Sequence, residues 1–137
     1  MSSTPIEVAR TGEHTFTATN PRGAQVAIGR DGAPGAFTPG ELLLAAIAGC
    51  SAVTSENLLV RRIGEDAPLR VRADRSTDPA DPNRFASVQV TFDVDLDQVD
   101  PEQRVKLSEA VQRAVERSCT VSRSVESGTP VELEPPR

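Results

Sequence analysis

An α+β fold is predicted from the order in which strand and helix patterns follow one another along the chain. Three short alternating segments come first, a long apolar helix follows, and two more strands precede a second helix. Hairpins segregated from helices in this way favour antiparallel sheets over a doubly wound parallel sheet. A length of 137 residues favours one main core. We therefore expect a single domain over residues 1–137.

The first third of the chain has the pattern of a small antiparallel sheet. Apolar and polar side chains alternate in three short segments, residues 6–8, 15–18 and 25–28. Alternate side chains of a strand share one face, so each segment predicts a half-exposed strand. A loop rich in glycine and proline follows over residues 29–37 and contains Arg30.

The strongest local signal predicts a helix from Pro39 to about Ile63. Thr38 is an N-cap residue and Glu41 stands three positions later, which is the capping-box pattern, with proline at the first helical position. Gly64 is a typical C-terminal stop. The first half of this helix is apolar on every side, and such helices are enclosed by protein. The pattern predicts a helix buried between two sheets or at a subunit interface.

The second half of the chain predicts a pair of strands followed by helices. Residues 69–74 and 88–96 alternate apolar and polar side chains, and a polar loop over residues 76–83 separates them. Asp100 precedes an amphipathic stretch that ends near Cys119 and predicts a second helix. A short turn or helix then runs to Gly128. Beyond it, apolar positions 131 and 133 predict a last short strand.

Composition argues against several kinds of partner. The net charge is −5, no basic block is present, and the only aromatic residues are four Phe. Nucleic-acid binders combine a basic surface with stacking rings, so we expect none. The longest apolar run, residues 42–53, is shorter than the roughly 20 residues that a membrane span needs. Residues 1–5 lack the features of a signal peptide, so we expect a cytoplasmic protein that does not bind membranes.

Two cysteines in a reducing compartment are more often reactive, or simply buried, than a permanent disulfide. With a single histidine, His14, they cannot form a good tetrahedral zinc site without several carboxylates, so we expect no metal and no cofactor. Cys50 lies within the apolar helix, where a thiol is commonly inert and its pKa is raised. Its reactivity would need a nearby cation, for which Arg30 is the candidate. Cys119 follows the second helix, where flanking arginines and the amides of the next helical turn favour a thiolate.

Two stretches together resemble the OsmC/Ohr family. Residues 37–50, FTPGELLLAAIAGC, are similar to the family's central-helix signature, which combines proline, acidic positions, a Leu/Ala-rich run and a cysteine. Residues 118–126, SCTVSRSVE, resemble its second-cysteine segment. The resemblance implies an OsmC-like fold, with antiparallel sheets packed around a long buried central helix, in an intertwined homodimer.

The resemblance also implies a peroxidase. Cys50 would attack the peroxide, Cys119 would resolve the sulfenic acid, and Arg30 and Glu41 would assist. The apolar wall over residues 42–47 favours organic hydroperoxides as substrates. An external dithiol, often a lipoyl group in this family, would reduce the resulting disulfide. In well-known family peroxidases the glutamate directly follows the proline, whereas Gly40 stands there in this chain.

Alternatives to a peroxidase remain open at this point. The departure at Gly40 favours a non-catalytic dimeric protein that binds a fatty or aromatic molecule in an apolar cleft. A thiol redox sensor, whose disulfide alters a partner surface, is a second alternative. The capping box accounts for Glu41 without any catalytic role, and Thr120 replaces a proline that is common after the second cysteine.

Overall fold

The computed structural model describes residues 5–137. These residues form two compact units, which meet within one helix, between Leu44 and Ala45. Residues 1–4, which contribute to the expectation that no signal peptide is present, lie outside the described residues.

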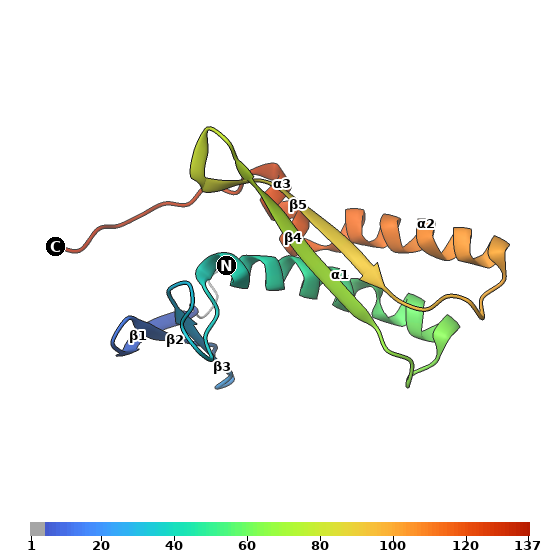
Figure 1. The fold of residues 1–137 in the computed structure, drawn as a ribbon, viewed down its shortest axis with the longest axis horizontal. Helices are drawn as coiled ribbons and strands as arrows, with labels where there is room; N and C mark the ends of the chain where they lie inside the picture. The colour runs from blue at the N-terminus through green and yellow to red at the C-terminus, as the bar shows by residue number, and fades with distance from the viewer. Residues whose placement is uncertain (1–4) are drawn as a thin grey trace. The chain divides into compact units, whose positions relative to one another are not determined.

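The first unit contains a three-stranded antiparallel sheet in the order β1-β2-β3 (Figure 1). The strands are β1 (Glu7–Gly12), β2 (Thr15–Thr19) and β3 (Gln25–Gly29). The β2–β3 turn forms because the Asn20 side chain accepts hydrogen bonds from two backbone amides, a local pattern that competes well with regular structure. The three strands predicted for this part of the chain are confirmed.

The loop after β3 brings the chain to the start of the long helix. Phe37 closes it, because its amide donates to the Ala27 carbonyl and its carbonyl accepts from the Gly29 amide, each at 2.9 Å. Arg30 lies just inside this closed loop, and its side chain is exposed. The loop therefore gives the backbone at Arg30 a defined position and leaves its guanidinium in solvent.

The long helix α1 (Pro39–Ile63) has the predicted bounds. The Thr38 amide donates to Glu41 Oε1 at 2.8 Å, and the Glu41 amide donates to Thr38 Oγ1 at 3.1 Å, so the predicted capping box is confirmed. At the other end Gly64 has φ +91°, a left-handed conformation that glycine adopts without strain. Its amide bonds the Val60 carbonyl at 2.8 Å.

By length and composition alone, α1 would suffice to cross a membrane. The predicted absence of a span rested on a shorter apolar run, and the helix extends well beyond that run. One such helix is weak evidence for a membrane protein, because core helices of soluble proteins have the same properties. In the second unit α1 turns Ile47, Ser51, Ser55 and Leu59, at intervals of four residues, toward the interior.

The second unit begins with a long hairpin of β4 (Arg70–Asp78) and β5 (Asp81–Asp93). The predicted polar loop over residues 76–83 is wrong. Ser76, Thr77 and Asp78 are still paired with β5, and irregularities in the register there accommodate the change. Two prolines and two aspartates made this stretch look like a loop, but an exposed hairpin tip tolerates them because few of its backbone groups need a partner.

Two helices complete the second unit, namely α2 (Pro101–Ser118) and α3 (Thr120–Ser127). Asp100 occupies the N-cap of α2 but makes no side-chain cap hydrogen bond. The hairpin lies across α1, with α2 beside it (Figure 1), and the core that these elements share is built on Leu59, Leu107 and Val111. Apolar residues of β5 and of the segment after it, including Phe92 and Val94, pack against this core.

The α+β class, with antiparallel sheets and one long helix, is confirmed. The predicted last strand is wrong, because residues 129–137 form no strand and the side chains of Val131 and Leu133 are 93% and 84% exposed. Two apolar residues cannot stabilise a strand when no neighbouring strand pairs with them. The single-domain expectation and the dimer stay predictions.

Candidate functional site

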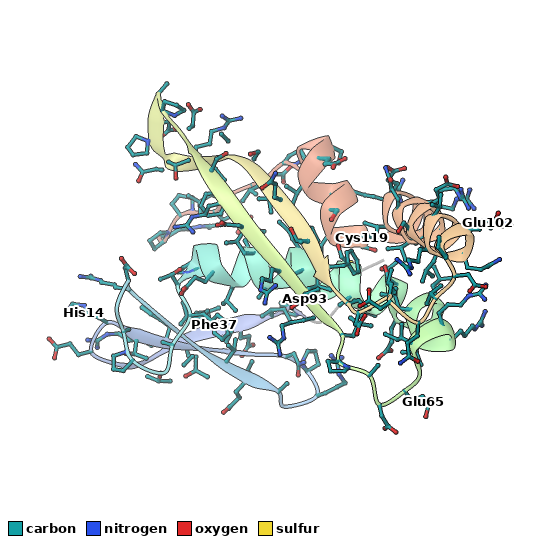
Figure 2. The ribbon with its side chains drawn as sticks, turned by 45° about the vertical axis from the view of Figure 1, so that its right-hand side comes forward. His14, Phe37, Glu65, Asp93, Glu102 and Cys119 are labelled. Atoms are coloured by element: carbon teal, nitrogen blue, oxygen red, sulfur yellow. The ribbon has the colours of Figure 1, made fainter. Side chains whose placement is uncertain are left out.

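The two cysteines, far apart in the sequence, lie beside each other in the second unit. Cys50 comes from the middle of α1, and Cys119 stands at the junction of α2 and α3, where Figure 2 labels it. Both are free thiols. The Cys50 thiol is close enough to the Cys119 sulfur to act on it as a hydrogen-bond partner. The arrangement brings together two groups that can exchange between dithiol and disulfide.

Cys119 is fully buried, with no exposed surface, whereas Cys50 is partly exposed. Burial raises the pKa of the Cys119 thiol, because it disfavours the charged form. Cys50, the side chain and amide of Ser122, and Ser51 lie where they can stabilise a charged sulfur, and together they outweigh burial and lower that pKa below its usual value. Cys119, the buried residue, is therefore the one stabilised as a thiolate, and Cys50 is the partly exposed residue of the pair.

The position of Cys119 follows from its place between two helices. Its amide bonds the Val115 carbonyl at 3.0 Å, which ends α2, and its carbonyl accepts the Arg123 amide at 3.0 Å within α3. Cys119 is thus the N-cap residue of α3, where the helix dipole favours a negative charge. Its thiol donates to Ser122 Oγ at 3.3 Å.

Two serine hydroxyls on α1 are buried without a hydrogen-bond partner. Ser51 is 1% exposed and Ser55 is 0% exposed, and neither Oγ has a partner among the described residues. An unpaired buried hydroxyl destabilises a fold by about 1–3 kcal/mol. Ser51 directly follows Cys50 and lies near Cys119, although its hydroxyl does not reach hydrogen-bonding geometry in this structure.

A cavity of about 430 Å³ lies in the second unit next to Ser51. Most of its walls come from β5, the segment directly after it, and α2, and its lining is largely apolar. The lining includes Val90, Phe92, Val94, Leu107, Val111 and Val115. A cavity of this size and lining fits the apolar part of a small organic molecule. The predicted wall over residues 42–47 takes no part in this cavity.

The other two predicted site residues, Arg30 and Glu41, belong to the first unit, and the cysteine pair belongs to the second. Arg30 is exposed, and Glu41 is engaged in the capping box. Their catalytic roles stay predictions. No group of three or more potential metal ligands occurs within residues 5–137.

Reasoning from the sequence did not identify Ser51, Ser122 or the cavity. A signal for Ser51 was present, because serines 51 and 55 interrupt an apolar helix at a helical interval. The apolar stripe of α2 was recognised as a packing face. The cavity between this face of α2 and β5 depends on how the two elements pack, which the sequence pattern does not show.

Comparison with known proteins agrees with this architecture. The family described as OsmC-like protein matches residues 31–134. An uncharacterised protein of Mycobacterium tuberculosis strain H37Rv is 39% identical over 131 residues, which cover 96% of this chain and 95% of that protein. A hypothetical protein from Aquifex aeolicus has a TM-score of 0.69 at 20% identity, with 96% of this chain and 93% of that chain covered.

Two further structures carry descriptive names. An OsmC-like protein from Mycoplasma pneumoniae has a TM-score of 0.65 at 19% identity and covers 93% of this chain and 90% of its own. The organic hydroperoxide resistance protein OhrB of Bacillus subtilis has a TM-score of 0.55 at 23% identity, with 96% and 97% covered. At these identities the structural matches show a shared fold. The family match over residues 31–134 shows more: the chain belongs to the OsmC-like protein family.

Proposed function

We propose that this protein is a thiol-dependent peroxidase that reduces organic hydroperoxides through Cys50 and Cys119. The observation that carries the proposal is the contact between these two free thiols, one partly exposed and one fully buried. The family includes proteins named for organic hydroperoxide resistance, such as OhrB of Bacillus subtilis. Cys50 and Cys119 are the two cysteines of the chain, and together they offer a nucleophilic thiol next to a second thiol that can attack its sulfenic acid.

Cys50 is the attacking thiol in this mechanism, because a peroxide can reach a partly exposed sulfur and cannot reach a fully buried one. The Cys50 proton passes toward Cys119, which accepts a hydrogen bond from it in the charged form. The Cys50 thiolate sulfur bonds one peroxide oxygen and the O–O bond breaks. The departing alkoxide takes the proton from Cys119 and leaves as an alcohol, so Cys119 is again a thiolate. Cys50 then carries a sulfenic acid.

Cys119 completes the turnover. Its thiolate attacks the Cys50 sulfur, hydroxide leaves as water after taking a proton, and a disulfide forms. The peroxide has gained two electrons and the two thiols have lost them. An external dithiol restores the thiols by exchange. Arg30 and Glu41 are the residues proposed to orient the peroxide and balance charge, which a planar guanidinium does well.

The cavity next to Ser51 favours an organic substrate. Its apolar lining would bind the hydrocarbon part of a hydroperoxide and gives hydrogen peroxide no comparable contact. The same cavity suits the alternative function, a protein that binds a fatty or aromatic molecule without reacting with it. Reactivity of Cys50 distinguishes the two functions.

The proposal includes a homodimer in the cytoplasm. In the second unit α1 leaves Ala46, Gly49 and Val53 exposed at intervals of three and four residues, so they share one face of the helix, and Val53 is 78% exposed. An exposed apolar face of this kind marks an interaction surface. A second copy of the chain would cover it.

The test is stopped-flow reduction of cumene hydroperoxide with dihydrolipoamide as the reductant. Cys50→Ser should abolish turnover. Cys119→Ser should still react once, leaving a sulfenic acid on Cys50 that dimedone traps. The wild type should form an intrachain disulfide with one equivalent of peroxide. Rates no faster than free cysteine in all three proteins would refute the peroxidase and favour the binding protein. A Cys50→Ser protein that keeps the first reaction would show that the two roles are reversed.

A further inference from the structure

We propose that Ser51, with Ser122, holds Cys119 as the leaving thiolate when the Cys50–Cys119 disulfide is reduced, so that an external dithiol attacks Cys50 only. This rests on the proposed function for the existence of the disulfide. It assigns Ser51 a role as a positioning residue that acts through Cys119. It also sets the direction of the recycling step.

The Ser51 hydroxyl is buried next to the cysteine pair. Ser51 is 1% exposed and its Oγ has no partner among the described residues. A buried hydroxyl without a partner is unfavourable, and alanine would remove the penalty at almost the same volume. The hydroxyl lies near the Cys119 sulfur, which is a weak acceptor as a thiol and a strong one as a thiolate. The missing partner therefore becomes available when Cys119 is charged.

Cys119 also contacts Ser122 and the start of α3. In the thiol state Cys119 donates to Ser122 Oγ at 3.3 Å. A hydroxyl rotates freely, so Ser122 can donate to the sulfur once the thiol proton is gone. The sulfur also stands at the N-cap of α3, whose dipole favours a negative charge, although no capping hydrogen bond forms in the thiol state.

Cys50 has none of these features. It lies mid-way along α1, away from a helix N-terminus, and its side chain is partly exposed. In a disulfide between the two, the accessible sulfur and the better leaving group are therefore different atoms. Attack occurs on the accessible sulfur, and exchange is faster when the departing thiol has the lower pKa. Both factors select the same direction.

A thiolate of the external dithiol bonds the Cys50 sulfur, the S–S bond breaks, and its electron pair goes to the Cys119 sulfur. The second thiol of the reductant then attacks the reductant sulfur of the mixed disulfide and releases Cys50. The dithiol becomes a cyclic disulfide and loses two electrons, which the protein disulfide gains. Its two protons end on Cys50 and Cys119 or in solvent.

The test compares Ser51→Ala with Ser55→Ala, which also removes a buried, unpartnered hydroxyl but one turn further along α1. In a Cys50→Ser background, ultraviolet thiolate absorbance follows the titration of Cys119 alone. Ser51→Ala should raise that pKa, Ser55→Ala should leave it unchanged, and Ser51→Thr should restore it. Both alanine variants should be at least as resistant to denaturant as the parent, which excludes misfolding as the cause.

The disulfide is made with diamide for the kinetic arm, so that no peroxide chemistry is involved. Reduction by dihydrolipoamide should slow at least about threefold in Ser51→Ala relative to Ser55→Ala. A monothiol in excess, quenched early, should be found by mass spectrometry on Cys50, with Cys119 free. Equal titrations and equal rates in the two variants would remove Ser51 from this role, and a monothiol on Cys119 would reverse the direction. Neither result depends on peroxidase activity, so the two proposals can fail separately.

Discussion

Glu41 has one structural role and one proposed catalytic role, and substitutions can separate them. Its carboxylate accepts the Thr38 amide at 2.8 Å, and its own amide donates to Thr38 Oγ1 at 3.1 Å. Glu41→Gln keeps an oxygen that can accept from Thr38, because glutamine also serves in a capping box. It removes only the charge at the start of α1. Thr38→Ala does the reverse, since it removes half of the cap and keeps the carboxylate.

The magnitudes follow from these contacts. Loss of a threonine N-cap costs about 1 kcal/mol of stability. Loss of an exposed charge near a helix N-terminus costs about 0.3–1 kcal/mol. Thr38→Ala should therefore lower the free energy of unfolding by about 1 kcal/mol and leave the peroxide rate near that of the parent. Glu41→Gln should lower stability less, and the rate of Cys50 oxidation should fall at least about tenfold if the charge assists catalysis.

Two assays on the same proteins decide the outcome. Denaturant unfolding measures the free energy, and single-turnover stopped-flow with cumene hydroperoxide measures the rate. Glu41→Gln with an unchanged rate would show that Glu41 is only a capping residue. A rate loss in Thr38→Ala as large as that in Glu41→Gln would show that helix fraying, and not the charge, controls reactivity.

Three further predictions concern charge, pH and assembly. Arg30→Ala should slow peroxide reduction with little change in the free energy of unfolding, because Arg30 is exposed in a loop. An unchanged rate would show that Arg30 has no part in the reaction. Burial raises the pKa of Cys119, but the hydrogen-bonding groups around it lower this pKa more, so it lies below the usual 9.0. The Cys119 thiolate therefore adds stability that is fully present above pH 9.0 and is lost as the pH falls through the pKa of the folded state. The stability difference between wild type and Cys119→Ala should therefore grow as pH rises toward 9.0 in denaturant titrations, and a flat difference would contradict the lowered pKa. Val53→Asp should shift a dimer toward monomer in light scattering, because Val53 is 78% exposed on an apolar helix; a stable wild-type monomer at micromolar concentration would rule out the dimer.

Local signals in the sequence were sufficient for the boundaries of the helices. The ends of α1 depend on contacts within a few residues, namely the capping box of Thr38 and Glu41 at one end and Gly64 at the other. They can therefore be predicted without tertiary information. The same holds for α3, which stops at Gly128, where φ is +71°. Alternation in the first half of β4 and the second half of β5 was equally predictable, because half-buried and exposed side chains alternate there. The first strand was expected to be half-exposed, but all six residues of β1 are exposed.

Which strands pair, and how far the pairing extends, could not be predicted from local sequence signals. The tip of the β4–β5 hairpin looked like a loop because its residues are poor strand formers, yet register with the opposite strand continues to Asp78 and Asp81. Val131 and Leu133 looked like a strand, but no neighbouring strand pairs with them. Strand formation depends on a partner that lies elsewhere in the sequence, and the local pattern does not contain it.

The sequence by itself determined which residues are able to do the chemistry. Two cysteines in recognisable segments, a capped apolar helix and an α+β order were sufficient for the fold class and the candidate pair. Only the tertiary structure decided that Cys119 is the buried sulfur and Cys50 the accessible one, that Ser51 and Ser122 lie next to Cys119, and that the apolar cavity is lined by β5 and α2. The physical reason is that burial, access and the pKa of a thiol depend on atoms from distant parts of the chain.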